Sequence, residues 1–335
     1  MKRYKDLTLP VGSNLYGVAT DSILDAPTYM DIMRASGLQF DEVNPNAHGL
    51  KNCTAAISCT ERIIDQNASQ QYFEQQLSGH VKYNTEVSAL IDVPSSGYSS
   101  SGQVILDKAF VKLNDGSQQR YDFAVNCTSA HVPMQTNGAL KSEASVFQPC
   151  VMLVYRLKNK AGASTDCLPS RIVVDGNFVS VFPRIAKDGT ITYTLSSVEH
   201  TPLGNFETAA AARECIAAFE ADPSRVMRKR ELMESAARTY FLDFDKDLVY
   251  DSFFTSIKTK TRSASDYRAC ITHLSPHCRV ASAYACKITG IFPAEQKILA
   301  WLADCWRRRA GGAGSSAKST EPSRTITMPW PQSKL

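Results

Sequence analysis

Three strand-like runs in the middle of the chain constrain its fold more than any other feature. They cover residues 150–157, 170–185 and 190–197, and Asp-Gly pairs at 175–176 and 188–189 mark turns. In the last run, Ile191, Tyr193 and Leu195 alternate with small hydroxyl residues, as in a half-buried antiparallel strand. The runs therefore predict an antiparallel sheet with one wall against a cavity or a helix layer.

The flanking segments alternate between helical and strand patterns. A helix is expected over 60–78, with Thr60 as its N-cap, and two or more helices over 206–260, with a break at Asp222-Pro223. Strands are expected at 81–92, in a hairpin over 109–128 that turns at 114–116, and at 278–288 before a helix at 293–309. This mixture predicts the α+β class, with antiparallel strands in the middle and a strand-to-helix step near each end.

Composition excludes several classes of protein. Of the 335 residues, 43% are hydrophobic and 21% are charged, which is typical of soluble globular chains. No run of about 18 apolar residues predicts a membrane span, and the first residues, MKRYKDLTLP, lack the apolar stretch of a secretory signal. We therefore expect an intracellular protein in which the ten scattered cysteines are reduced and mostly buried thiols.

The positive charge of the chain belongs to its C-terminal tail. The net charge is +4, but residues 307–335 contain six Lys or Arg and one Glu, so residues 1–306 carry a net charge of −1. A nearly neutral body gives no electrostatic footprint for nucleic acid. Residues 306–335, rich in Gly, Ser, Thr and Pro, are expected to form a disordered basic tail.

The tail ends in a tripeptide that can act as a targeting signal. Ser333, Lys334 and Leu335 match the tripeptide that peroxisomal import receptors read, and a flexible tail would leave it accessible. We therefore expect a peroxisomal location with the import receptor as a partner, and a cytoplasmic location as the alternative.

Common catalytic motifs are absent from the sequence. No GxSxG, HExxH or kinase-loop motif occurs in the sequence. The sequence therefore gives no support for acyl transfer, metalloprotease or phosphotransfer activity. Cys270, His273, His277 and Cys278 could supply zinc ligands, but Pro276 interrupts the helix that would align the histidines. No metal is expected.

Two segments have the pattern of ligand-binding edges. RYDFAVNCTSAH, at 120–131, is an apolar strand that runs directly into small and polar residues. RVASAYACKITGIFPAEQKILAWL, at 279–302, is a strand, a short turn and a helix, whose N-terminus can hold an anion. Ligands of α/β folds bind just beyond the carboxyl ends of strands, although ordinary loop exits and packing give the same patterns.

Taken in order, these segments resemble a family. GSNLYGVA at 12–19, ERIIDQNASQQYFEQQLS, KYNTEVSALI, YDFAVNCTSAH, IVVDGNFVSVFPR and ACKITGIFPAEQKIL look like the FAD-dependent amine and D-amino-acid oxidase superfamily, over about residues 10–304. The resemblance implies a body over 1–305 with FAD-facing segments at about 10–20, 60–135 and 262–305. It also implies an antiparallel substrate domain at about 140–260.

The resemblance assigns roles to particular residues. Backbone and side chains near FAD are implied for Ser13, Asn14, Gly17, Val87, Cys127, Thr128, Ser129, Lys287, Ile288 and Thr289. Arg184 and Tyr193, on strands of the expected substrate domain, are candidates for substrate carboxylate recognition, because an Arg fork matches a carboxylate. Their alternative role is on the surface or in packing.

The chain departs from the family pattern in one respect. The family opens with a βαβ unit whose GxGxxG glycines let the backbone approach the pyrophosphate, and this sequence contains no such motif. The pattern therefore reads as an α/β-type FAD-binding fold that is incomplete. The leading expectation is an FAD-dependent oxidase that transfers a hydride from the C–N carbon of a small amino acid or amine to flavin N5 and yields hydrogen peroxide. The alternative is a truncated, non-catalytic remnant that serves as a binding protein.

Overall fold

The chain divides into two compact units. The computed structural model describes residues 2–10, 13–93, 108–136, 139–141, 145–158, 169–174, 178–186, 188–261, 271–274, 279–284 and 291–311. Unit 1 consists of Met1–Val81 and Gln148–Lys258, and unit 2 consists of Lys82–Phe147 and Thr259–Leu335. Helices and mainly antiparallel strands occur together, which confirms the expected α+β class.

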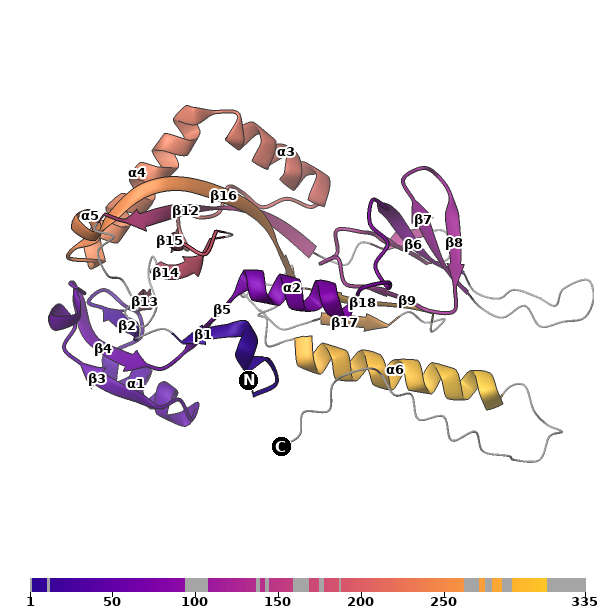
Figure 1. The fold of residues 1–335 in the computed structure, drawn as a ribbon, viewed down its shortest axis with the longest axis horizontal. Coiled ribbons are helices and arrows are strands. Elements are labelled where there is room, and N and C mark those ends of the chain that lie inside the picture. Colours follow the sequence, from indigo (N-terminus) through magenta and orange to yellow (C-terminus); the bar gives the residue numbers. More distant parts are fainter. Residues whose placement is uncertain are drawn as a thin grey trace, which may run out of the picture. The chain divides into compact units, whose positions relative to one another are not determined.

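Unit 1 is built on an eight-stranded sheet that contains the strand-like runs of the mid-chain. Its order is β16-β12-β15-β14-β13-β2-β4-β3, and β13 and β2 pair in parallel (Figure 1). The bounds are β2 Asn14–Ala19, β3 Phe40–Val43, β4 Cys53–Cys59, β12 Ser145–Leu157, β13 Ser170–Val174, β14 Val179–Ile185, β15 Ile191–Ser197 and β16 Leu248–Thr261.

The turn between β14 and β15 explains the second Asp-Gly pair. Gly189 has a φ of +80°, which favours glycine, and the Asp188 carboxylate accepts hydrogen bonds from the Thr190 backbone N–H and hydroxyl. The predicted turn at 188–189 is therefore confirmed, whereas 175–176 lies outside the described residues.

Three helices cover one face of this sheet: α3 (Ala209–Glu220), α4 (Pro223–Tyr240) and α5 (Phe244–Asp247). Figure 1 shows α3 and α4 running along one side of the curved strands β12 and β16. The predicted break is confirmed, because Asp222 caps α4 by accepting from the Ser224 and Arg225 backbone N–H groups, and Pro223 occupies the first turn. The alternating apolar residues of β14 and β15 pack against α4 in the main core.

Two helix predictions in unit 1 were wrong at their boundaries. The helix expected over 60–78 is α2, Gln66–Gln76, with Asp65 as its N-cap in place of Thr60. Ile63 and Ile64 lie instead in β5 (Arg62–Ile64), which pairs with β1 (Thr8–Pro10), as their β-branched side chains favour. Likewise, the end of the region expected to be helical, 248–260, is strand β16, rich in aromatic and β-branched residues.

The remaining elements of unit 1 lie near its first residues. They are the 3-10 helices η1 (Lys2–Leu7) and η2 (Asn46–His48), and the helix α1 (Ala26–Ala35). Helix α1 starts at the N-cap Asp25, which accepts from the Thr28 backbone N–H at 2.8 Å. Its buried Tyr29 and Met30 pack on Val18 and Ile57, on the sheet face opposite to α4.

The described residues of unit 2 form two smaller sheets and one long helix. The five-stranded sheet has the order β11-β10-β6-β7-β8, and the three-stranded sheet has the order β17-β18-β9. The bounds are β6 Val87–Val93, β7 Lys108–Leu113, β8 Gln118–Tyr121, β9 Ala124–Asn126, β10 Met134–Thr136, β11 Ala139–Lys141, β17 Ile271–Leu274, β18 Val280–Tyr284 and α6 Ile291–Gly311. The hairpin of β7 and β8 turns at Gly116, as predicted.

Helix α6 runs to Gly311, so residues 306–311 of the expected tail are helical. Trp301 and Cys305 on α6 pack against Ala281 of β18. Residues 312–335, including Ser333, Lys334 and Leu335, lie outside the described residues. Within the described part of the chain, no helix combines the length and the apolar character needed to cross a membrane.

Candidate functional site

The strand register of unit 1 gives the large sheet two different faces. Side chains of successive residues in a strand point to opposite faces. Val179, Val181, Tyr193 and Leu195 pack in the core under α4, so the residues between them point to the other side. We call this other side the hydroxyl face, after the residues that β14 and β15 place there: Ser180, Phe182, Arg184, Thr192, Thr194 and Ser196.

Asn14, one of the predicted cofactor residues, points to the same side of the sheet as the hydroxyl face, because its neighbour Leu15 points into the core. Asn14 on β2 pairs in register with Ser170 on β13, and the Ser170 hydroxyl donates to the Asn14 side-chain oxygen. The Asn14 amide donates to the carbonyls of Cys59 and Glu61 at 3.4 and 3.2 Å. Asn14 is therefore held rigidly within unit 1, and a role beside FAD stays a prediction.

Arg184 is the cationic side chain that β14 adds to this face. Its guanidinium carbon lies 4.6 Å from the centre of the Phe254 ring of β16, within the range of a cation–π contact. Its Nε atom is buried and has no hydrogen-bond partner in the described structure. An arginine that is stacked on an aromatic ring but still has a free donor is prepared for a planar anion such as a carboxylate.

Tyr193 and Gly17 lie on the opposite, helix-covered face. Tyr193 pairs with Pro183, one residue from Arg184, so the two predicted substrate residues point to opposite sides of the sheet. Burial raises the pKa of Tyr193 to about 12, with the Arg171 guanidinium lowering it and the Asp247 carboxylate raising it. The structure does not bring Arg184 and Tyr193 together, and Arg171 is the cation beside Tyr193.

The candidate cofactor edge lies in unit 2, beyond the parallel strands β9 and β18. Strands β9 and β18 pair in parallel, so both carboxyl ends lie at one edge of the three-stranded sheet. Buried Asn126 ends β9: its side-chain oxygen accepts from the Thr128 N–H and hydroxyl, and its amide donates to the Val132 carbonyl at 2.8 Å. Ser129 and Ala130 have φ values of +53° and +62°.

This loop fits the edge of a bound flavin in part. Cys127, Thr128 and Ser129 are small, and Cys127 is exposed, so a flat ligand can approach the backbone. The Ser129 carbonyl is fixed by the Thr259 hydroxyl at 2.8 Å. The phosphate-binding glycines have no counterpart in the sequence, and Lys287, Ile288 and Thr289 lie outside the described residues.

Two other predicted cofactor residues have defined surroundings. Val87 begins β6, where it pairs with Leu113 of β7, in unit 2. The Ser13 carbonyl in unit 1 accepts a hydrogen bond from the Ser170 backbone N–H at 3.1 Å. The unit boundaries group residues 13–81 with 148–258, whereas the resemblance placed 10–20 and 60–81 among cofactor-facing segments. Their place beside FAD stays a prediction.

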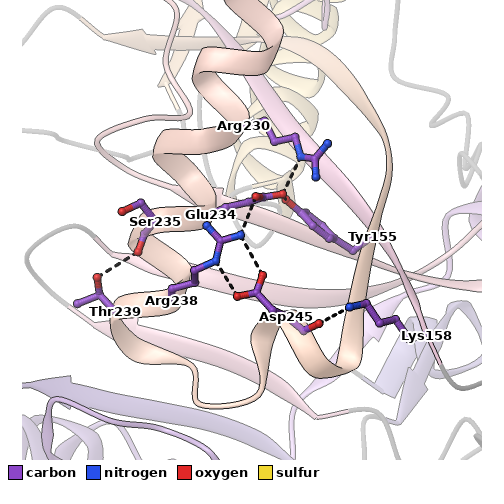
Figure 2. A network of polar contacts seen from close by, with 8 residues as sticks. All are labelled: Tyr155, Lys158, Arg230, Glu234, Ser235, Arg238, Thr239 and Asp245. Atoms are coloured by element: carbon purple, nitrogen blue, oxygen red, sulfur yellow. Dashed lines mark hydrogen bonds and ion pairs between the residues drawn. The ribbon is translucent and has the colours of Figure 1, made fainter.

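A polar network around the buried residues Glu234 and Tyr155 joins helix α4 to the sheet and is structural in character. Figure 2 shows Glu234 receiving hydrogen bonds from Tyr155 and Arg230 at 2.9 and 2.7 Å, and from Arg238 at 3.0 Å. Burial alone would raise the pKa of Glu234, but these hydrogen bonds and charges hold it below its ordinary value. Burial is the main cause that raises the pKa of the Tyr155 hydroxyl. The group is fully paired, so it offers no free acid or base.

Comparison with known proteins decides the family. No protein-family model matches the chain. The FAD-dependent monooxygenase FPY4 from Fusarium mangiferae is 30% identical over 305 residues, which cover 91% of this chain and 73% of that protein. The chain belongs to the FAD-dependent oxidoreductases. FAD is accordingly the cofactor of its family, which confirms the expected enzyme class and cofactor.

Solved structures agree with this assignment at the level of the fold. The L-proline dehydrogenase from P. horikoshii covers 85% of this chain and 70% of its own length, with a TM-score of 0.54 and 12% identity. This confirms the expected FAD-dependent oxidoreductase fold. A modified fructosyl peptide oxidase from Aspergillus nidulans has 11% identity and a TM-score of 0.48, over 82% of this chain and 66% of its own length.

Two residues beside the predicted substrate residues were not anticipated from the sequence: Phe254, which lies beside Arg184, and Arg171, which lies near Tyr193. Phe254 lies in a segment that was expected to be helical, so its place beside Arg184 could not be anticipated. Arg171 lies in a predicted strand, and its separation from Arg184 follows from the register of β13 and β14. The sequence of β13, SRIVV, has no period-two alternation, so no local signal placed Arg171 on a face of the sheet.

Proposed function

We propose that this protein oxidises the C–N bond of a small amino acid or amine, with hydrogen peroxide as a product. Family membership supports the redox chemistry. The observation that carries the substrate class is Arg184 on the hydroxyl face, stacked on Phe254 and with a buried donor left over. A substrate carboxylate would satisfy that donor with a charge-assisted hydrogen bond.

The residues of this chain would bind and orient the substrate. Arg184 holds a carboxylate, and the neighbouring ring of Phe254 restricts the orientation of the guanidinium. Residues Cys127, Thr128 and Ser129 would contact the edge of FAD, which supplies a hydride acceptor when it is bound. The overall reaction consumes amine, water and O2 and gives a carbonyl compound, ammonia and H2O2.

The first experiment tests FAD binding by this chain. The purified protein is mixed with FAD, and its visible spectrum and melting temperature are recorded. Flavin bands that stay with the protein after gel filtration, together with a higher melting temperature, are expected of an enzyme. Their absence would favour the alternative of a binding protein that keeps the scaffold without the activity.

Substitution of Arg184 tests the substrate class. Arg184→Gln is expected to raise KM for amino acids roughly 10- to 100-fold, the equivalent of a lost charged hydrogen bond, and to leave KM for simple amines unchanged. Arg225→Gln is the matched control, because Arg225 also lies over a phenylalanine ring, Phe219, but is exposed on α4. Equal effects on amino acids and amines would reject a carboxylate-binding role.

A second candidate function is monooxygenation. The name of the relative FPY4 favours it. Oxygen uptake that needs NAD(P)H and gives a hydroxylated product would support this function, whereas stoichiometric H2O2 without NAD(P)H supports the oxidase.

We also propose that Ser333, Lys334 and Leu335 direct the protein to peroxisomes. The tripeptide and the expected peroxide product support this location. A fluorescent protein fused before residue 1 should give punctate fluorescence that coincides with a peroxisomal marker. Deletion of Leu335 should leave the fluorescence in the cytosol. Unchanged puncta would show that the tripeptide is not the peroxisomal targeting signal.

A further inference from the structure

A second candidate binding site lies on the helix-covered face of unit 1. A cavity of about 250 Å³ opens there between strands β13–β15 and the segment around α5. Its polar lining consists of Arg171, Tyr193, Asp243 and Asp247, and its apolar lining includes Leu157 and Phe244. The volume is below the range of about 300–1,000 Å³ for drug-sized ligands, so the cavity suits a small molecule.

Arg171 is the unusual member of this lining. It pairs with Val181 in register, so it shares the helix-covered face with Tyr193 and lies on the opposite side from Arg184. Its Nε atom is buried without a hydrogen-bond partner among the described residues. The guanidinium lies so close to Gly49 that a Cβ there would be 3.2 Å from Nη2. The backbone of Gly49 therefore limits how the arginine can move.

The opposite wall carries negative charge that does not pair with Arg171. No ion pair within 4.0 Å joins Arg171 to Asp243 or Asp247 in the described structure, although all three line the same cavity. The Asp243 carboxylate has Lys246 at 3.7 Å, whereas Asp247 makes no ion pair there. Both Arg171 and Asp247 are near enough to the Tyr193 hydroxyl to shift its pKa in opposite directions.

The arrangement of charges narrows the chemistry of a ligand. A simple anion would satisfy Arg171 but would be repelled by two carboxylates, and a simple cation would leave the buried Nε donor of Arg171 unpaired. A molecule with a carboxylate and an ammonium group can pair the carboxylate with Arg171 and the ammonium group with the carboxylates of the opposite wall. The apolar lining of the cavity accepts an aliphatic side chain. We propose that this cavity binds a small zwitterionic amino acid with an apolar side chain, at a site separate from the Arg184 face.

The test measures binding in the full chain carrying Arg184→Gln, so that a substrate site on the hydroxyl face does not contribute. L-Leucine and D-leucine are titrated by calorimetry and by thermal shift. Isopentylamine, which lacks the carboxylate, and 4-methylpentanoate, which lacks the ammonium group, are the matched analogues. Saturable binding of a leucine enantiomer is expected, and both analogues should bind at least tenfold more weakly.

Variants of the cavity complete the test. In the Arg184→Gln background, Arg171→Gln and Asp247→Asn should each weaken the binding of leucine at least tenfold. Arg225→Gln in the same background should leave this binding unchanged. Circular dichroism and melting curves identify a variant that fails to fold, and the other variant then decides. No saturable binding of leucine, equal binding of the analogues, or full binding in a folded Arg171→Gln or Asp247→Asn variant would overturn the proposal. None of these results depends on FAD or on turnover, so failure here is distinguishable from failure of the proposed oxidase.

Discussion

At the scale of single residues, Gly17 shows how packing determines residue type. Its position on β2 faces the core, and a Cβ there would lie 2.8 Å from the Cys53 Sγ and 3.2 Å from the Leu50 Cδ1. Only glycine lets β2 approach these two side chains without displacing them. The resemblance assigned Gly17 to the flavin, whereas the local structure gives it a packing role that is sufficient by itself.

Gly17→Ala is expected to lower the free energy of unfolding by about 1–3 kcal/mol, because the added methyl overpacks the core beside Cys53. Urea denaturation measures the loss. Because Cys53→Ala removes the sulfur, the double variant should lose less than the sum of the two single variants. Strictly additive losses would show that the contact with Cys53 is not the cause.

At the scale of elements, helix α4 is joined to strand β12 by Glu234. Glu234 is only 7% exposed, and its carboxylate accepts hydrogen bonds from the Tyr155 hydroxyl and from two arginines of its own helix. Arg238 in turn pairs with Asp245 of α5 at 2.7 Å, and Lys158 donates to the Asp245 carbonyl (Figure 2). The network therefore fixes the helix layer over the sheet that carries Arg184 on its other side.

Glu234→Gln is expected to lower the free energy of unfolding by about 2 kcal/mol at neutral pH, because it removes the charge that both arginines face. The folded state holds the pKa of Glu234 below its ordinary value, so this stability is present above the unfolded pKa of about 4.3 and is lost as the pH falls through the folded pKa.

Denaturation curves of wild type and variant at several pH values measure this difference. The gap between them should be widest at neutral pH and should close in acid. The matched control is Glu231→Gln, on the exposed side of α4, which should change little at any pH. A gap that does not vary with pH would contradict an ionised Glu234.

At the scale of the whole molecule, each unit has a core of its own. Met233 of α4 is completely buried in the core of unit 1, and Val280 of β18 is completely buried in a core of unit 2. Apolar burial is the main source of stability in such cores, so each core should protect the hydrogen bonds of its own strands.

Met233→Ala is expected to cost about 2–5 kcal/mol in unit 1, as for other large-to-small core substitutions. Hydrogen exchange should then become faster in β14 and β15, whereas Val280→Ala should make exchange faster in β9, β17 and β18. Mass spectrometry of peptides from both units checks this. Equal acceleration in both units by each variant would show that the units unfold as one.

Much of the fold could be predicted from local patterns. The period-two alternation in 190–197, the turn at Gly116 and the helix break at Asp222-Pro223 act over a few residues, and all three are present. The helix start was placed too early because Thr60 and Asp65 are both good caps, and the pairing of β5 with β1 decides between them. Long-range pairing leaves no local signal.

The sequence by itself determined the α+β class, the central antiparallel strands and the resemblance to FAD-dependent oxidoreductases. Only the tertiary structure decided that Arg184 and Tyr193 point to opposite faces, that Phe254 stacks on Arg184, and that Arg171 lies in a cavity with Asp247. The physical reason is register. A shift of one residue between paired strands moves every side chain to the other face, and register is set by contacts between strands that are far apart in the sequence.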